Sequence, residues 1–259
     1  LCRRKVKSVI ILVTFTVSVM LSLLTWSLFR ALLLDPPYFD PNGEYYVLTH
    51  TDKKWASAGH FTMREMDAYM AREDIFSEIH PLTFFKSIFV NTPGGNERLL
   101  AAYLSSSVLQ LSGARPILGQ LFSKQDDKHN APTKVLLSER LWNNSYSSDP
   151  YIVGKSIEIH GEACAIVGVL PATYRFPNDQ DVWLNYGSLD AIMQSQYAKY
   201  ALRTALVKLK PGVSKKQAIQ GLIITRNSLS PPSRLLEHNE IPFLSGYRQF
   251  FLPNEMQAN

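Results

Sequence analysis

The side chains in this sequence that could bind a metal or transfer a proton are six histidines, two cysteines and several carboxylates. No two histidines fall within five residues of each other, so H-E-x-x-H and related zinc motifs are absent. The histidines are His50, His60, His80, His129, His160 and His238. Two cysteines, Cys2 and Cys164, are too few for a four-cysteine zinc site or a disulfide-rich scaffold. We therefore expect no metal site, unless the fold brings distant ligands together.

The closest acidic pairs are Glu73-Asp74 and Asp126-Asp127. Two neighbouring carboxylates can act as general acid and base, but we expect both pairs to be solvated charges in a loop or at a helix end. Arg175 lies between Tyr174 and Phe176, which predicts a surface arginine stacked on an aromatic ring, with an anion site as the alternative. Neither G-x-S-x-G nor G-x-x-x-x-G-K-[ST] occurs. We expect no catalytic residue, no bound cofactor and no enzymatic activity.

The formal net charge of +5 is concentrated at the N-terminus. Arg3, Arg4, Lys5, Lys7 and Arg30 lie within residues 1–34, which contain no acidic residue. The rest of the chain has 22 basic and 22 acidic residues. A nucleic-acid-binding protein more often carries its basic excess on the folded domain, so nucleic acid is not an expected partner.

A long apolar segment follows these basic residues. Residues 8–29 contain no charge, proline or glycine, and as a helix they would be about 33 Å long, enough to cross the hydrocarbon core of a lipid bilayer. The alternative is a cleaved signal peptide, which would have a shorter apolar region and a small-x-small cleavage site. We expect an uncleaved membrane anchor. The basic residues before it predict a cytoplasmic N-terminus, with everything after residue 35 outside.

Apolar patterns and turn residues predict the elements of the remaining chain. The expected strands are 45–49, 83–90, 99–104, 134–137, 156–159, 163–170, 181–184 and 202–209. The expected helices are 62–79, 105–111, 138–146 and 214–229, and two of them begin with capping boxes, at Thr62 with Glu65 and at Ser214 with Gln217. Strands on both sides of Gly161 predict an antiparallel hairpin in which this glycine has a positive φ.

Strands and helices alternate irregularly, which predicts an α+β fold with a mixed or antiparallel sheet rather than a doubly wound one. We expect three parts. Residues 1–34 form a cytoplasmic basic stub and a transmembrane helix, residues 35–230 an extracytoplasmic domain, and residues 231–259 a C-terminal segment that leads towards a second membrane helix missing from this chain.

Several segments, in order between about residues 105 and 225, resemble the MacB-type periplasmic core domain of FtsX-like ABC transporter permeases. Each is a turn or packing pattern, and their ordered concurrence carries the resemblance. The segments are 109–122 (LQLSGARPILGQLF), Val135-Leu136-Leu137-Ser138 with Leu141-Trp142, Asp149-Pro150 with Val153-Gly154-Lys155, 157–161 running into 166–171, Phe176-Pro177, 181–184, and 207–213.

The resemblance implies a permease of the bacterial inner membrane whose periplasmic domain couples a separate cytoplasmic ABC ATPase to work outside the membrane. It also implies a second permease copy and a periplasmic adaptor as partners. The chain would then be a non-catalytic transporter component, used for export or mechanotransmission, and a piece of a longer permease. Two alternatives remain: a single-span sensor whose outer domain binds a ligand, and a membrane-anchored hydrolase, which the missing motifs disfavour.

Overall fold

The structure is a computed structural model of the chain. It describes residues 2–29, 40, 42–52, 58–59, 61–85, 87–159, 161–177, 179–189, 201–229, 240–247 and 250. The chain divides into two compact units, Leu1–Asn42 and Gly43–Asn259, which we call the N-terminal unit and the sheet unit. The end of the apolar segment at residues 30–39, three of the histidines (His60, His160 and His238) and most of residues 248–259 lie outside the described residues.

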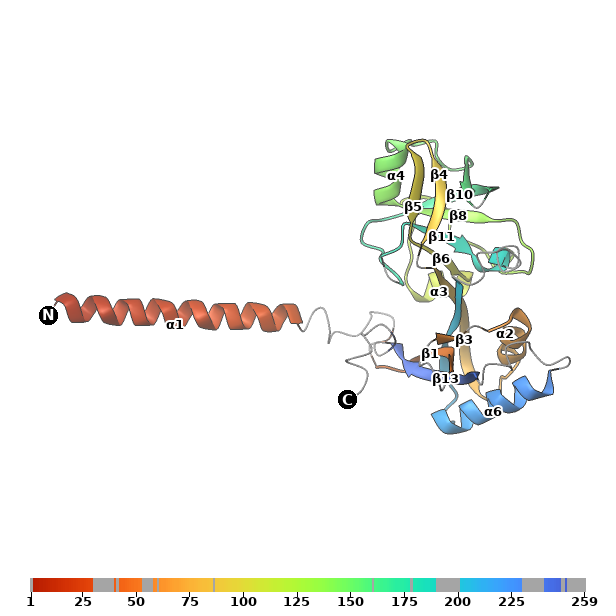
Figure 1. Cartoon of the computed structure of the whole chain (residues 1–259), viewed down its shortest axis with the longest axis horizontal. Helices are drawn as coiled ribbons and strands as arrows, with labels where there is room; N and C mark the ends of the chain where they lie inside the picture. The colour runs from red at the N-terminus through yellow and green to blue at the C-terminus, as the bar shows by residue number, and fades with distance from the viewer. Residues whose placement is uncertain are drawn as a thin grey trace. The chain divides into compact units, whose positions relative to one another are not determined.

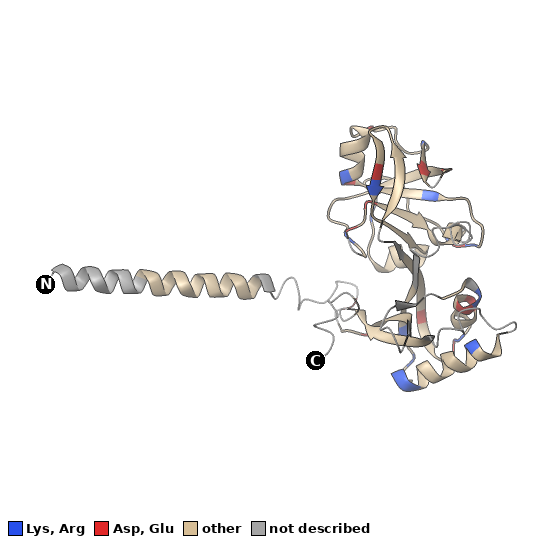
Figure 2. Cartoon of the chain, viewed as in Figure 1, with Lys and Arg blue, Asp and Glu red and all other residues tan. Residues whose placement is uncertain are grey.

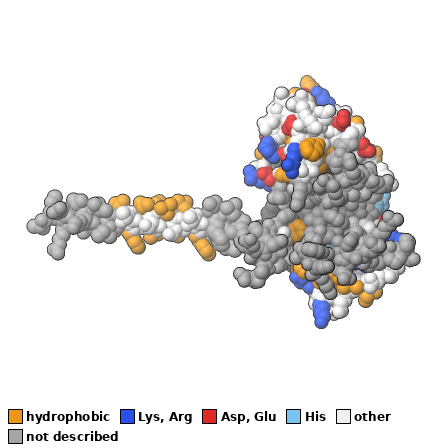
Figure 3. Space-filling model, viewed as in Figure 1, with side chains coloured by type: hydrophobic (Ala, Val, Ile, Leu, Met, Phe, Trp, Pro, Cys, Tyr) orange, Lys and Arg blue, Asp and Glu red, His pale blue; other side chains and the backbone are white. Residues whose placement is uncertain are grey.

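The N-terminal unit contains one helix, α1 (Cys2–Phe29). Its hydroxyl side chains donate to carbonyls one turn earlier, as from Ser18 Oγ to Thr14 O and from Ser22 Oγ to Ser18 O, both 2.9 Å. These bonds satisfy polar groups inside the helix. Large apolar side chains such as Phe15 and Leu24 are more than 60% exposed. Figure 3 shows apolar side chains along the described part of α1. Among the described residues, no helix reaches the combined length and hydropathy of a membrane span.

The sheet unit is built on one mixed sheet with the strand order β13-β1-β12-β3-β6-β11-β8-β10-β9-β4-β5, in which β2 also pairs with β1 and β7 with β10. Pairs β8–β10 and β6–β11 are parallel and the other pairs are antiparallel, which confirms the predicted α+β class with a mixed sheet. The strands are β1 (Tyr45–Asp52), β2 (Ala58–Gly59), β3 (Phe76–Phe85), β4 (Ile88–Thr92), β5 (Gly95–Leu99), β6 (Ala101–Leu104), β7 (Leu118–Gly119), β8 (Lys134–Ser138), β9 (Ser156–Ile159), β10 (Glu162–Leu170), β11 (Val182–Asn185), β12 (Ala201–Leu209) and β13 (Glu240–Gly246).

Helices pack at both ends of this sheet (Figure 1). They are α2 (Met63–Met70), α3 (Ser106–Leu111), α4 (Glu139–Tyr146), α6 (Lys215–Ser228) and a short 3-10 helix, η2 (Tyr186–Ser188). Both predicted capping boxes are present: the Thr62 and Ser214 side chains accept from the backbone N–H three residues on, and Glu65 and Gln217 accept from the cap N–H in return. Ser105 and Ser138 cap α3 and α4 with one hydrogen bond each, because each side chain accepts from the backbone N–H three residues on.

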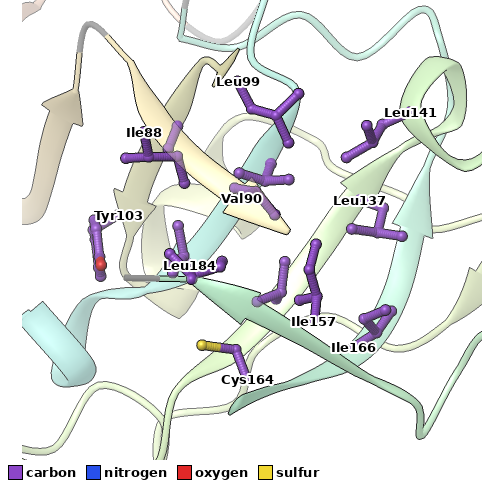
Figure 4. Packing of buried hydrophobic residues seen from close by; sticks show 14 of the residues in the cluster. Ile88, Val90, Leu99, Tyr103, Leu137, Leu141, Ile157, Cys164, Ile166 and Leu184 are labelled. Atoms are coloured by element: carbon purple, nitrogen blue, oxygen red, sulfur yellow. The ribbon is translucent and has the colours of Figure 1, made fainter. Parts of the chain in front are cut away.

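Two hydrophobic clusters among the described residues define two lobes of the sheet unit. The hairpin lobe comprises β4–β6, β8–β11 and α4, and its core includes Val90, Leu137, Ile157, Ile166 and Leu184. Figure 4 shows these side chains converging from different strands. The alternation on β9, with Ile157 and Ile159 buried and Ser156 and Glu158 exposed, places one face of that strand in the core.

The helix lobe comprises β1, β12, β13, α2 and α6, together with the first residues of β3. Its core is formed by the inward faces of the two helices and the sheet beneath them. The buried members are Leu48, Phe61, Met66, Tyr69, Ile75, Phe76, Ala205, Val207, Ala218, Leu222 and Leu244. Strand β3 links the lobes, because it pairs with β12 along its whole length and with β6 at Leu82–Phe84.

The predicted helix over 62–79 is wrong in its second half. Helix α2 ends at Met70 with Ala71 as its C-cap, and the chain enters β3 at Phe76. Apolar residues at 76 and 79 fit a helical repeat, but here Phe76 and Ile79 lie opposite Leu209 and Val207 of β12. Cross-strand pairing with β12, a strand distant in sequence, overrides the local pattern.

Two predicted strands are each interrupted. The segment 83–90 divides into the end of β3 and the start of β4, and these strands have different neighbours. The segment 99–104 divides at Leu100 into the end of β5 and the whole of β6. Strand β5 follows β4 through a tight turn in which Thr92 lies opposite Gly95. Strand β13 was not predicted at all. It pairs with β1 along seven residues, from Tyr46 opposite Gly246 to Asp52 opposite Glu240.

The hairpin around Gly161 is confirmed. Ile159 lies opposite Glu162, and Gly161 has a φ of +83° in the turn. A second glycine is more tightly constrained. Gly119 has a φ of +71°, and a Cβ there would lie 2.1 Å from the carbonyl oxygen of Val167. Strand β7 can therefore approach β10 only with glycine at this position.

Candidate functional site

The histidines of the described residues lie apart and none joins a ligand cluster. His50 is buried in the helix lobe, with its ring 4.2 Å from that of Phe61. Nε2 of His80 lies 3.2 Å from Glu78 Oε2, and Nε2 of His129 lies 3.2 Å from Asp67 Oδ2. In the part of the chain that the structure describes, no group of three or more His, Cys, Asp or Glu side chains could hold a metal ion.

The expectation of solvated charges is wrong for Asp126. Its side chain is 8% exposed and forms an ion pair with Lys134 Nζ at 2.6 Å. Burial alone would raise the pKa of Asp126, but hydrogen bonds from Lys134 and Ser123 outweigh burial and hold it below the usual value. Asp127 accepts from the N–H and the hydroxyl of Ser106, at the start of α3, and burial raises its pKa. Both carboxylates hold a loop in place, and neither lines the groove described below.

Arg175 and Cys164 offer no reactive group. The Arg175 side chain is 74% exposed, as predicted for a surface arginine, and its Nε lies 3.8 Å from Asp179 Oδ1. Cys164 is buried in the hairpin core, and burial together with the charge of Glu162 raises the pKa of its thiol to about 11. A thiol with such a pKa is a poor nucleophile at neutral pH.

A buried ion pair joins the two helices of the helix lobe. Nε of Arg226 on α6 donates to Oε1 of Glu65 on α2 at 3.0 Å, and the two side chains are 5% and 0% exposed. The other oxygen of Glu65 accepts from the N–H and hydroxyl of Thr62 in the capping box. Beside them, burial and the charge of Glu65 raise the pKa of Tyr69. The capping residue of one helix therefore also fixes the position of the other.

The hairpin lobe carries a groove of about 640 Å³ on its surface. Its floor is a row of side chains across three strands: Asn91 of β4 lies opposite Glu158 of β9, which lies opposite Ala163 of β10. All three are exposed, whereas Val90, Ile157 and Ile159 point into the core. The outward face of the sheet, made of short or polar side chains, thus forms an open floor.

Turns form the walls of this groove. One wall is the β4–β5 turn with Thr92 and Pro93, and another is the end of α4 from Ser145 to Asp149. The α4 wall has a defined conformation, because Ser147 and Ser148 both adopt left-handed backbone angles and the Trp142 indole donates to Asp149 O at 2.9 Å. Thr92 is likewise held, donating to Glu97 Oε1 and to Gly95 O.

The charges in the groove nearly cancel. Lys155 Nζ lies 2.5 Å from Asp149 Oδ2, an ion pair that closes the loop between α4 and β9. Glu158 adds one negative charge to the floor. Burial and the charge of Glu97 raise the pKa of Tyr146 to about 12, so its phenol stays protonated. The groove can therefore bind through hydrogen bonds, and among its described lining residues no nucleophile is paired with a base.

Basic and acidic residues are interspersed over the described part of the sheet unit, with no stripe of one sign in the view of Figure 2.

Sequence reasoning did not find the groove. The alternation of Ser156 and Glu158 with Ile157 and Ile159 could have indicated an exposed face, but the neighbouring strand β4 is distant in sequence, so Asn91 could not be placed beside them.

The family model of the MacB-like periplasmic core domain matches residues 8–223, so the chain belongs to this family. No curated protein is significantly similar to the chain. The resemblance stated from the sequence segments is thus confirmed for the core domain. Sequence segments made of turn and packing residues identified the family.

Solved structures share the fold. The periplasmic region of MacB from Actinobacillus actinomycetemcomitans superimposes with a TM-score of 0.57 at 11% identity, covering 83% of this chain and 94% of that one. A domain of a putative permease protein from Porphyromonas gingivalis gives 0.54 at 14% identity, covering 79% and 90%. The extracellular domain of the ABC-type transporter YknZ from Gram-positive bacteria gives 0.53 at 10% identity, covering 77% and 99%.

Proposed function

We propose that the chain is a non-catalytic permease component of an ABC-type transporter, used for export or mechanotransmission. Its sheet unit would lie outside the membrane and carry out mechanical work driven by a cytoplasmic ATPase. The observation that carries the proposal is membership of the MacB-like periplasmic core domain family over residues 8–223.

The sheet supports transmission of force. Hydrogen-bonded pairing runs without a break from β13 at one edge to β5 at the other, through both lobes. Strand β3 lies between the lobes and pairs on both sides at Leu82–Phe84. A displacement applied to one lobe would therefore be passed to the other through paired backbone rather than through a loose linker.

The anchor and its orientation are part of the proposal. Residues 8–29 would span the bacterial inner membrane, with the four basic residues before them in the cytoplasm and the sheet unit in the periplasm or outside the cell. Alkaline phosphatase and a fluorescent protein fused separately at Asn259 test this. We expect the phosphatase fusion to be active and the fluorescent-protein fusion to be dark. An inactive phosphatase fusion together with a fluorescent second fusion would show that the orientation is the reverse of the proposed one.

The expected partners are a cytoplasmic ABC ATPase subunit, a second permease copy and a periplasmic adaptor. The test is coupled ATP hydrolysis. The full chain is cross-linked in its own cells and purified, co-purified proteins are identified by mass spectrometry, and ATP hydrolysis is measured. We expect a protein with Walker sequences and hydrolysis that is lost when residues 8–29 are replaced by an unrelated apolar helix. Hydrolysis by the chain alone, or no ATPase among the cross-linked proteins, would overturn the proposal.

The groove favours one second candidate, a membrane-anchored ligand sensor. A ligand that binds only the folded state stabilises it by mass action, so a sensor predicts a saturable rise in melting temperature with its ligand and no dependence on an ATPase. The ATPase measurement therefore separates the two functions.

A further inference from the structure

The groove on the hairpin lobe has the dimensions of a small-molecule site. Its volume of about 640 Å³ lies within the roughly 300–1,000 Å³ usual for ligand pockets. Most such pockets are lined mainly by apolar side chains. This one is lined mainly by hydroxyl, amide and charged groups, from Asn91, Thr92, Ser145, Ser147, Ser156 and Glu158. A ligand that fits it must bring its own hydrogen-bonding groups.

Charge disfavours anionic ligands in this groove, and unpaired hydrogen-bonding groups disfavour apolar ones. Among the described lining residues, an anion would find Lys155 as the one cation, and Lys155 is already paired with Asp149 while Glu158 repels negative charge. A purely apolar ligand would leave the hydroxyl and amide groups without partners, which costs about 1–3 kcal/mol for each group it buries. A neutral ligand with many hydroxyl groups meets neither obstacle, because each hydroxyl both donates and accepts.

We propose that this groove binds a neutral oligosaccharide. The Glu158 carboxylate accepts from sugar hydroxyls, and the Asn91 amide beside it both donates and accepts. Ala163, on the other side of Glu158, leaves space for a ring to lie on the floor. Three adjacent strands extend over about 10 Å, the length of a disaccharide.

The inference goes beyond the proposed function and does not depend on it, because binding is measured on the protein alone. The probes are triacetylchitotriose and maltotriose, titrated calorimetrically into the full chain in a detergent that has no sugar headgroup. Trigalacturonate and trilysine are the anionic and cationic comparisons. We expect at least one neutral trisaccharide to saturate below about 10 mM, with neither charged probe binding more tightly.

Two substitutions locate the site. Glu158→Gln keeps the shape but removes the charged acceptor, and we expect affinity to fall about tenfold. Ala163→Leu fills the floor and should abolish binding. Glu73→Gln, the same chemical change on an exposed residue outside the groove, should leave affinity unchanged. Each variant is checked for an unchanged melting temperature.

The proposal fails if neither neutral trisaccharide saturates, if trilysine or trigalacturonate binds more tightly, or if Glu158→Gln and Ala163→Leu bind as well as the unmodified chain. None of these outcomes bears on ATPase coupling, so the proposal and the transporter function can fail independently.

Discussion

The two lobes of the sheet unit bury polar groups in different ways. The core of the hairpin lobe is composed of apolar side chains, with Cys164, Tyr103 and Tyr186 as its most polar members, and in the ion pair of that lobe between Asp126 and Lys134 the lysine remains 32% exposed. The helix lobe buries an ion pair, Glu65 with Arg226, beside its core. The stability of an apolar core does not depend on any one charge. Removing one partner of a buried ion pair leaves the other charge buried and unpaired, which lowers the free energy of unfolding. The lobes should therefore respond differently to comparable substitutions.

The largest expected effect is in the helix lobe. Arg226→Met leaves the Glu65 carboxylate buried beside the core, and we expect a loss of about 3–5 kcal/mol in the free energy of unfolding. Urea denaturation of the full chain measures it. Lys155→Met, which breaks the exposed pair with Asp149, is the matched control and should cost less than about 1 kcal/mol.

A double variant identifies the cause. Glu65→Gln combined with Arg226→Met removes both charges while the amide can still accept in the capping box, so it should recover most of the loss. If the double variant is as unstable as Arg226→Met alone, lost packing rather than an unpaired charge explains the sensitivity.

The hairpin lobe should be most sensitive at a glycine. Gly119→Ala places a Cβ 2.1 Å from Val167 O at a positive φ, and we expect a loss of about 3 kcal/mol or more. Gly161→Ala is the matched control, because its φ is also positive but nothing lies within 4 Å of the added Cβ. It should cost only the backbone strain, about 1–2 kcal/mol. Equal melting temperatures for the two variants would refute the close approach of β7 to β10.

A smaller effect concerns pH and the helix lobe. The Tyr45 hydroxyl, 2.6 Å away, and then His80 hold the pKa of Glu78 below its usual value. A lowered folded-state pKa stabilises the protein above about pH 4.3 and the contribution is lost as the pH falls through the lowered pKa. Glu78→Gln should therefore lose less stability than the unmodified chain between about pH 5 and 3, by under about 1 kcal/mol because the side chain is 40% exposed. Parallel pH curves for the two proteins would contradict this.

The smallest effect is expected at Tyr146 of the hairpin lobe. Its hydroxyl is buried with no hydrogen-bond partner among the described residues. Tyr146→Phe should therefore leave the free energy of unfolding unchanged or raise it by up to about 1 kcal/mol. Tyr45→Phe, which loses the bond to Glu78, is the contrasting variant and should cost about 1 kcal/mol. A clear loss in Tyr146→Phe would point to a partner for that hydroxyl.

Local signals predicted much of the fold. Capping residues such as Ser214 with Gln217 located helix starts, and the turn at Gly161 located a hairpin, because both depend on residues a few positions apart. The helix over 62–79 ended early because Phe76 pairs with Leu209, which no local pattern reveals. The groove and the Glu65–Arg226 pair were missed for the same reason: each joins residues that only the tertiary fold brings together.

The place of β1 in the sheet has a consequence for how the chain folds. Apart from the short β2, its partners are β12 and β13, so the first strand of the sheet unit pairs with the last two. Closing so long a loop is slow, and apart from its short pairing with β2, strand β1 stays unpaired until residues near 201 and 240 have reached the same compartment. In a chain that is exported before it folds, the unpaired backbone groups of β1 would therefore be exposed during export. If synthesis or export stopped before β13, one edge of β1 would remain unpaired and could pair with another chain, which leads to aggregation.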